Sequence, residues 1–279
     1  MSIVTFWNNG KEQTGKTLSA VAIATYMAIQ HNYKILLVST GHNDKTIDNC
    51  FWEDKKTKRN FGIFGPNTSA AMESGVEGLS QIARSNKISP ENITNYTKVI
   101  FKDRLEILKG YKGEEQEKYD EIKETYLDII NAANQYYDLV LVDLDKEMGD
   151  NLVNSILEIS NLIVINLSQR LSIINHFIEK REEVPVLKSK KTLILIGRYD
   201  KYSKYTVKNI SRYMGEKNKV STIPYNTLFF EACEEAKVPN LFLKLKKLDE
   251  EDRNGFFIAE VGRASENIIY RLQDLAMRM

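Results

Sequence analysis

A glycine, a lysine and a threonine near the start of the chain have the spacing needed to bind phosphate. From Gly10 to Thr17 the sequence reads G-x-x-x-x-G-K-T, which is the pattern of a phosphate-binding loop. The loop follows the apolar run of residues 3–7 and precedes an alanine-rich stretch. Backbone N–H groups at such a strand–loop–helix junction converge on one anion, which the helix dipole also attracts. In this pattern Lys16 binds the outer phosphates of a nucleotide and the Thr17 hydroxyl ligates Mg²⁺.

The loop and one downstream acid form the predicted site. Its nucleotide-binding residues are Gly10, Thr14, Gly15, Lys16, Thr17 and Leu18. Asp143 ends an apolar run of strand length, where a carboxylate would hold Mg²⁺ together with Thr17. Asp145, two residues further on, is the alternative. The other interpretation is a plain glycine turn between a strand and a helix, but the surrounding elements favour nucleotide binding.

Apolar runs of strand length alternate along the chain with segments of helical period. This alternation predicts βαβ units and a mostly parallel sheet. The predicted strands are residues 3–7, 33–39, 105–110, 137–143, 161–167, 192–197 and 220–224. The predicted helices are residues 17–30, 74–86, 89–91 (a single turn), 119–135, 151–159, 168–181, 206–214, 226–236 and 265–279. Residues 40–67 are expected to be irregular and 112–119 exposed. No repeat or linker divides the chain, so we expect one α/β domain over residues 1–279, with three α/β/α layers.

Composition excludes several classes of protein. The chain has 279 residues and a net charge of +1, so a polyanion would have to bind to a local patch. The runs at residues 55–59 and 244–247 are the candidates for DNA. Cys50 and Cys233 have no metal-binding spacing, which favours a reduced, cytoplasmic setting. No apolar stretch approaches the roughly 18 residues of a membrane span, so no integral membrane association is expected.

The loop resembles the deviant Walker A motif of the ParA/MinD family, K-G-G-x-G-K-[ST]. Lys11 matches the family's signature lysine, which implies a homodimer on ATP binding in which this lysine reaches the partner's phosphates. Glu12 and Gln13 replace the two glycines of the motif. Lys11, Lys16 and Asp48 are then the catalytic candidates, with Asp48 at the position of the family's water-activating aspartate. The resemblance implies a P-loop NTPase fold of the SIMIBI type, with ATP and Mg²⁺ as cofactors.

Further segments carry the same resemblance. Residues 137–143 resemble the Walker B strand, and Asp143 its metal-binding acid. After the second strand, Ser39 and Gly41 stand where the family has two acids. Late in the chain, Arg198 and the Pro224-Tyr225 pair resemble segments that contact the base, although Gly197 replaces an asparagine. The Arg-Tyr-Asp sequence at 198–200 favours the TadZ/CpaE branch.

Two functions from different classes agree with these observations. The first is a slow ATPase switch that dimerises on ATP and positions cargo, either segregating DNA or placing a pilus or secretion apparatus through a protein partner. The second is a nucleotide-binding recruitment scaffold with little or no hydrolysis, which the altered loop favours. A metabolic enzyme on the same fold is a third alternative, and the absence of paired cluster cysteines argues against a reductase. Packing on the domain, rather than membrane targeting, is expected of the C-terminal helix.

Overall fold

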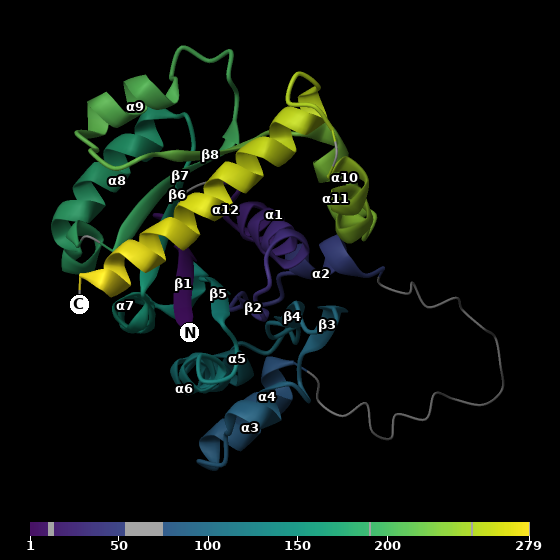
Figure 1. Cartoon of the computed structure of the whole chain (residues 1–279). Helices are drawn as coiled ribbons and strands as arrows, with labels where there is room; N and C mark the ends of the chain where they lie inside the picture. The colour runs from purple at the N-terminus through teal and green to yellow at the C-terminus, as the bar shows by residue number, and fades with distance from the viewer. Residues whose placement is uncertain (11–13, 54–74, 190, 247, 279) are drawn as a thin grey trace.

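The computed structural model describes residues 1–10, 14–53, 75–189, 191–246 and 248–278. Eight strands form one sheet in the order β3-β4-β2-β5-β1-β6-β7-β8 (Figure 1). Neighbouring strands pair in parallel, except for the antiparallel pair β3 and β4. The strands are β1 (Ser2–Trp7), β2 (Ile35–Ser39), β3 (Lys98–Phe101), β4 (Leu105–Leu108), β5 (Leu139–Asp143), β6 (Leu162–Leu167), β7 (Thr192–Tyr199) and β8 (Ser221–Pro224).

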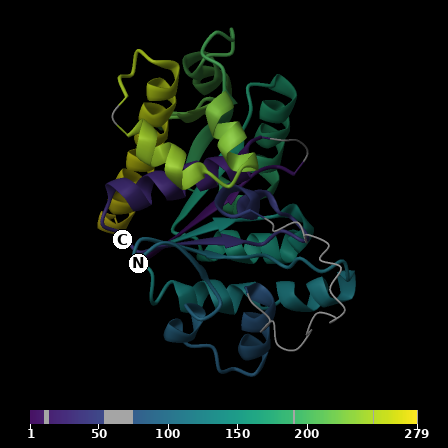
Figure 2. The ribbon, with the colours of Figure 1, turned by 90° about the vertical axis from the view of Figure 1, so that its right-hand side faces the viewer.

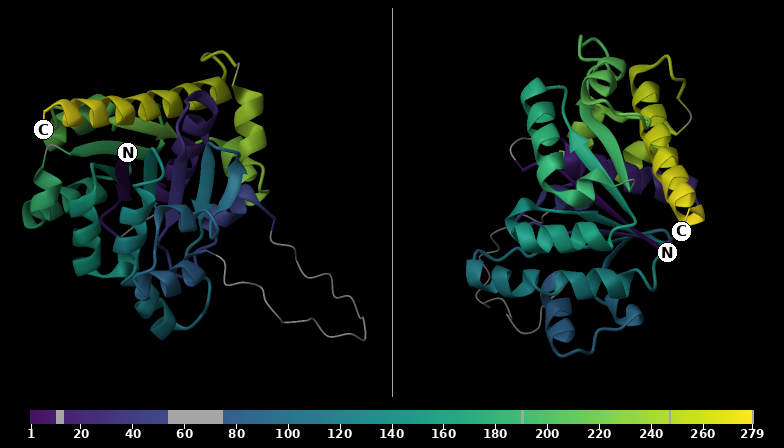
Figure 3. Two further views of the ribbon diagram at one scale, coloured as in Figure 1. Left: turned by 60° about the horizontal axis from the view of Figure 1, so that its bottom comes forward. Right: turned by 90° about the vertical axis from the view of Figure 1, so that its left-hand side faces the viewer.

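Helices cover both faces of the sheet. One face carries α3 (Val76–Arg84), α4 (Pro90–Ile93), α5 (Gln116–Lys123), α6 (Tyr126–Ala133), α7 (Asp150–Ile159), α8 (Leu171–Glu183) and α9 (Val207–Met214). The other carries α1 (Lys16–Gln30), α2 (Thr46–Phe51), α10 (Thr227–Glu234), α11 (Val238–Leu245) and α12 (Arg253–Met277). Short 3₁₀ turns lie at Lys146–Met148 and Pro185–Lys188. The right panel of Figure 3 shows strands between α8 on one side and α12 on the other.

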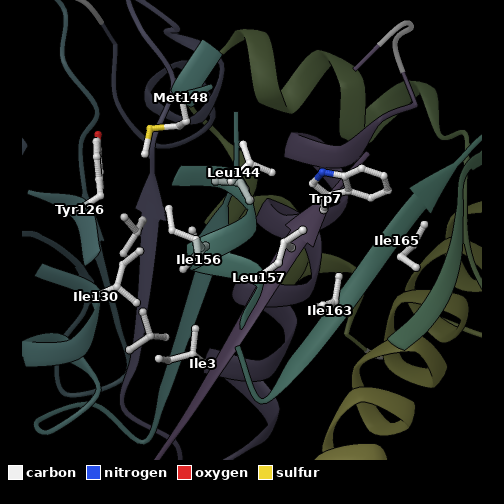
Figure 4. Close-up of a cluster of buried hydrophobic side chains, with 14 of the residues drawn as sticks. Ile3, Trp7, Tyr126, Ile130, Leu144, Met148, Ile156, Leu157, Ile163 and Ile165 are labelled. Atoms are coloured by element: carbon white, nitrogen blue, oxygen red, sulfur yellow. The ribbon is translucent and has the colours of Figure 1, made fainter. Parts of the chain in front are cut away.

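Alternate residues of each central strand enter opposite cores. In β1, Ile3 and Trp7 belong to one hydrophobic cluster, whereas Val4 and Phe6 belong to the other. A strand buried on both faces must be apolar at every position, which explains the continuous apolar runs. Figure 4 shows the first cluster, where Ile3 meets side chains of β6, α6 and α7. These two cores fix β1 in the middle of the sheet.

The first and last helices pack against each other. In Figures 1 and 2, α12 crosses the sheet beside α1. Their contact includes Gly262 of α12 and Tyr26 of α1, and a Cβ at Gly262 would lie 2.6 Å from the Tyr26 hydroxyl. Because α1 follows the phosphate-binding loop, α12 helps to hold the loop's helix in place.

The predicted fold class is confirmed, and some boundaries differ. The segment predicted as one helix over 119–135 is two helices that break at Glu124 and Thr125. The segment predicted to be irregular contains α2, and the final helix begins at Arg253 rather than at residue 265. Tyr119, at the end of the stretch predicted to be exposed, is buried. The edge strand β3 and the helix α11 were not predicted.

Candidate nucleotide-binding site

The loop between β1 and α1 has the backbone shape that its glycines permit. Gly10 and Gly15 have φ values of 79° and 76°, in the left-handed region that glycine enters without steric cost. Gly15 directly precedes α1, so the N–H groups of the first helical turn face the loop. Lys11, Glu12 and Gln13 lie outside the described residues.

The Asn8 side chain forms hydrogen bonds with two residues of the loop. Its side-chain oxygen accepts a hydrogen bond from the Gly10 N–H at 3.2 Å, and its amide nitrogen donates to the Thr14 hydroxyl at 3.1 Å. Thr14 is only 1% exposed. The Asn8 side chain therefore links Gly10 to Thr14.

Lys16, Thr17 and Asp143 form a connected cluster. The Lys16 amino group lies 2.7 Å from Asp143 Oδ1 and donates to the Leu144 carbonyl at 2.6 Å. The Thr17 hydroxyl donates to Asp143 Oδ2 at 2.9 Å. The parallel pairing of β1 with β5 sets this geometry, because it aligns Phe6 with Asp143. Hydroxyl and carboxylate oxygens are the ligands that Mg²⁺ prefers, so the cluster fits the predicted metal.

Asp145 has a different local role. Its carboxylate accepts the Glu147 N–H at 2.8 Å and caps the 3₁₀ turn that follows β5. Its own N–H donates to the Thr40 hydroxyl at 2.8 Å. Of the two acids proposed for the metal, the geometry favours Asp143.

The end of β7 packs directly on the phosphate-binding loop. A Cβ at Gly197 would lie 2.2 Å from the Thr14 carbonyl oxygen, so this position admits no side chain without a shift of the loop. Arg198 has a φ of 50°, and its Cγ would lie 3.3 Å from a Cβ at Gly15. In the sequence Gly197 is only a departure from a family pattern, whereas in the fold it permits the close approach of two backbones.

A cavity of about 270 Å³ lies over the loop. Its lining contains the predicted Thr14, Gly15, Lys16, Thr17, Leu18 and Arg198, together with Asn8, Thr46, Phe230, Cys233 and Glu234. A second cavity shares Arg198 with the first and contains the predicted Pro224 and Tyr225. The structure thus brings the loop and the predicted base-contacting residues into adjoining cavities. In α10 (Thr227–Glu234), the resemblance also covers Glu231-Ala232, but the residues that line the cavity, Phe230, Cys233 and Glu234, were not predicted.

Asp48 belongs to the same helix as Thr46 of the cavity lining, but its carboxylate pairs with lysines that do not line the cavity. It is 4% exposed in α2 and forms an ion pair with Lys112. Lys109 lies 3.9 Å from the same carboxylate, and burial lowers the pKa of Lys112. Asp48 is not among the described residues that line the cavity over the loop. Its catalytic role stays a prediction.

Among the residues that the structure describes, no group of three or more histidine, cysteine or acidic side chains could hold a metal ion. None of their helices has the length and apolar character needed to cross a membrane.

Comparison with known proteins places the fold. No protein-family model matches the chain, and no curated protein matches its sequence. A ParA family ATPase from Chlorobium tepidum superposes with a TM-score of 0.70 at 15% identity, covering 97% of this chain and 98% of that one. A plasmid partition protein from Borrelia burgdorferi, bound to AMPPNP, gives 0.60 at 18% identity with 98% of both chains covered. MinD of Pyrococcus horikoshii, complexed with Mg-ADP, gives 0.63 at 14% identity with 93% of both chains covered. The chain therefore has the fold of the ParA/MinD-type P-loop ATPases.

Proposed function

We propose that this chain, as a single domain, is an ATP-binding and Mg²⁺-dependent switch that dimerises on ATP and positions cargo. The observation that supports it most is the cluster of Lys16, Thr17 and Asp143, of which Lys16 and Thr17 line the 270 Å³ cavity. Its donors match the two halves of a metal–nucleotide complex, with a cation for phosphate and two oxygen ligands for Mg²⁺. The solved structures with AMPPNP and with Mg-ADP give the fold a precedent for both cofactors.

Each residue of the site has a task in this proposal. Lys16 and the N–H groups at the start of α1 bind the outer phosphates. Thr17 and Asp143 hold the metal, which when bound neutralises charge that develops on the phosphates. Arg198, Pro224 and Tyr225 contact the base. Lys11 completes the site of a second copy in the ATP-bound dimer, and DNA or a protein partner is the platform. Cytoplasmic localisation stays a prediction.

Two features of the chain support the alternative function, a nucleotide-binding scaffold with little or no hydrolysis. The Asp48 carboxylate is engaged by Lys112 and Lys109, away from the cavity lining. Ser39 and Gly41, at the end of β2, supply no carboxylate near the site. A protein built this way would bind ATP and hydrolyse it slowly or not at all.

Calorimetric titration with ATP and Mg²⁺ tests the core of the proposal. We expect Lys16→Ala to weaken ATP binding by at least roughly tenfold, because it removes a charge-assisted contact to phosphate. The matched control is Lys188→Ala, which removes a surface lysine paired with Glu182. Equal ATP affinity in the wild type and Lys16→Ala would refute the phosphate-binding assignment.

The rate of ATP hydrolysis and the molecular mass of the protein in solution distinguish the switch from the scaffold. The switch predicts phosphate release and a shift to the dimer with ATP, both lost in Lys11→Ala. Tight ATP binding without turnover would establish the scaffold instead. A monomer at every ATP concentration would rule out the dimerisation step.

A further inference from the structure

The chain's two cysteines are far apart in the sequence but meet in the fold. Cys50 belongs to α2 and Cys233 to α10, and these two helices pack against each other (Figure 1). Both thiols are free, and the two residues are 0% and 3% exposed. Because the sequence contains only these two cysteines, a disulfide within one chain must join them.

The two thiols interact with each other. A hydrogen bond with the Cys233 side chain is the largest of the causes that raise the pKa of Cys50, followed by burial and by the charges around it, which include those of Glu234 and Asp44. The helices that carry the two sulfurs are already packed together. A covalent bond between the sulfurs therefore needs only a local adjustment of the side chains and the helices.

The two thiols differ in their access from the nucleotide cavity. Cys233 lines the 270 Å³ cavity over the phosphate-binding loop, whereas Cys50, although it is among the described residues, does not. A small oxidant that enters this cavity therefore meets Cys233 first. The thiolate is the reactive form of cysteine, so the raised pKa of Cys50 also makes that thiol a poor first target.

Cys50 is connected to the wall of the same cavity through its own helix. Its thiol donates a hydrogen bond to the Thr46 carbonyl at 3.1 Å, and Thr46 lines the cavity. A disulfide has no proton to donate, so oxidation would remove this hydrogen bond. It would also tie α2 to α10, whose Phe230 and Glu234 line the cavity beside Cys233. Oxidation would thus change the wall that faces the nucleotide from two sides.

We propose that Cys50 and Cys233 form a reversible disulfide that regulates the nucleotide cavity, with hydrogen peroxide as the oxidant. In the first step the Cys233 sulfur attacks one oxygen of the peroxide and the O–O bond breaks, which leaves a sulfenic acid on Cys233 and releases water. In the second step the Cys50 sulfur attacks the Cys233 sulfur, and the hydroxyl group leaves with the Cys50 proton as a second water. A small thiol reductant reverses the change by thiol–disulfide exchange.

This chemistry agrees with a compartment that keeps thiols reduced, where disulfides are transient and respond to oxidants. A nucleotide in the cavity would cover Cys233, so ATP should slow the oxidation. The disulfide should in turn weaken ATP binding, because it alters both sides of the cavity wall. Only these two effects rest on the proposed function, whereas formation of the disulfide does not.

Oxidation of the full chain by hydrogen peroxide tests the proposal. Free thiols are titrated after denaturation, and peptide mapping without reductant identifies linked cysteines. We expect both thiols to disappear together, to be found in one linked peptide pair, and to return with dithiothreitol. Cys50→Ser, which keeps a donor for the Thr46 carbonyl, should stop at a sulfenic acid on Cys233 that dimedone labels. In the matched control, Cys233→Ser, the Cys50 thiol should stay reduced under the same treatment.

ATP with Mg²⁺ tests the connection between the thiols and the cavity. At an ATP concentration about ten times its Kd, roughly a tenth of the cavities are empty, so the wild type should oxidise about tenfold more slowly. The control is Lys16→Ala, in which the same ATP concentration should protect far less. Calorimetry on the oxidised wild type should show ATP affinity lowered by at least roughly fivefold, a typical coupling between two sites, and restored by dithiothreitol.

Several results would overturn the proposal. These are thiols that stay free under peroxide that oxidises the denatured chain, a disulfide that joins two chains, or a Cys50→Ser variant whose Cys233 takes no dimedone. Unchanged ATP affinity after oxidation would refute the regulatory role. If the wild type binds no ATP, the proposed function fails, while titration and mapping still decide whether the disulfide forms. The wild-type measurements need no substitution, so a variant that does not fold leaves the test intact.

Discussion

The Lys16 amino group lies 2.7 Å from the Asp143 carboxylate. The two side chains are 10% and 5% exposed, so water screens their attraction only weakly. The lysine that would bind phosphate is thus held by the acid that would bind metal. In the proposed function, phosphate and Mg²⁺ bind this same pair, so we expect the affinity for ATP to depend on Mg²⁺.

Replacing Asp143 should break this coupling. Asp143→Asn removes both the partner of Lys16 and a metal ligand, so we expect Mg²⁺ to lose its effect on ATP affinity. The buried lysine left behind should lower the free energy of unfolding by about 1–3 kcal/mol. Calorimetry with and without Mg²⁺ and urea denaturation measure the two effects. Asp145→Asn is the control, since Asp145 caps a turn. Full Mg²⁺ dependence in Asp143→Asn would contradict the metal assignment.

Gly197→Ala should weaken ATP binding by displacing the loop, although Gly197 is not among the predicted nucleotide-binding residues. The new methyl group would lie 2.2 Å from the Thr14 carbonyl oxygen, so the loop has to move. We expect a cost of about 1–3 kcal/mol, seen as weaker ATP binding. Gly215→Ala is the matched control, because it has a φ of 63° but nothing within 4 Å of its Cβ. It should lower stability by about 1 kcal/mol and leave ATP affinity unchanged. Equal ATP affinity in both variants would show that β7 does not support the loop.

A pair of variants decides what Asp48 does. Asp48→Asn and Lys112→Met each remove one member of an ion pair between a buried carboxylate and a half-buried lysine. If Asp48 only anchors α2, both should lower the free energy of unfolding by about 1–3 kcal/mol and leave ATP turnover unchanged. If Asp48 activates water, turnover should fall in Asp48→Asn alone. Steady-state phosphate release and urea denaturation distinguish these results.

Asn166 offers a test that should increase stability. It lies at the end of β6, is 0% exposed, and neither polar atom of its amide has a hydrogen-bond partner in the described structure. Replacing an unpaired buried amide by an apolar group of similar shape removes its desolvation cost. We expect Asn166→Leu to raise the free energy of unfolding by about 1 kcal/mol, measured in urea. A loss of stability would show that the amide has a partner in solution.

The central strands were predictable, and the edges were not. Strands such as β5 and β6 are buried on both faces, so their sequences are continuous apolar runs. In strand β3 both Lys98 and Val99 are exposed, and its four residues are too short a pattern to stand out in the sequence. The break before Tyr126 was hidden because apolar residues keep the helical period across it.

The candidate phosphate-binding residues could be recognised in the sequence because they belong to a local pattern. Lys16 and Thr17 belong to one motif, and Asp143 ends a recognisable strand. The contributions of Gly197 and Cys233 depend on elements that meet only in the folded chain. A glycine required by the approach of two backbones looks like any other glycine in the sequence.

The position of β1 in the middle of the sheet has a consequence for synthesis on the ribosome. Its neighbours β5 and β6 begin at Leu139 and Leu162, and α12, which packs on α1, begins at Arg253. A nascent chain therefore carries its phosphate-binding motif long before the strands and helix that shape it. We therefore expect the proposed ATP site to reach its folded shape only after α12, which packs on α1, has left the ribosome.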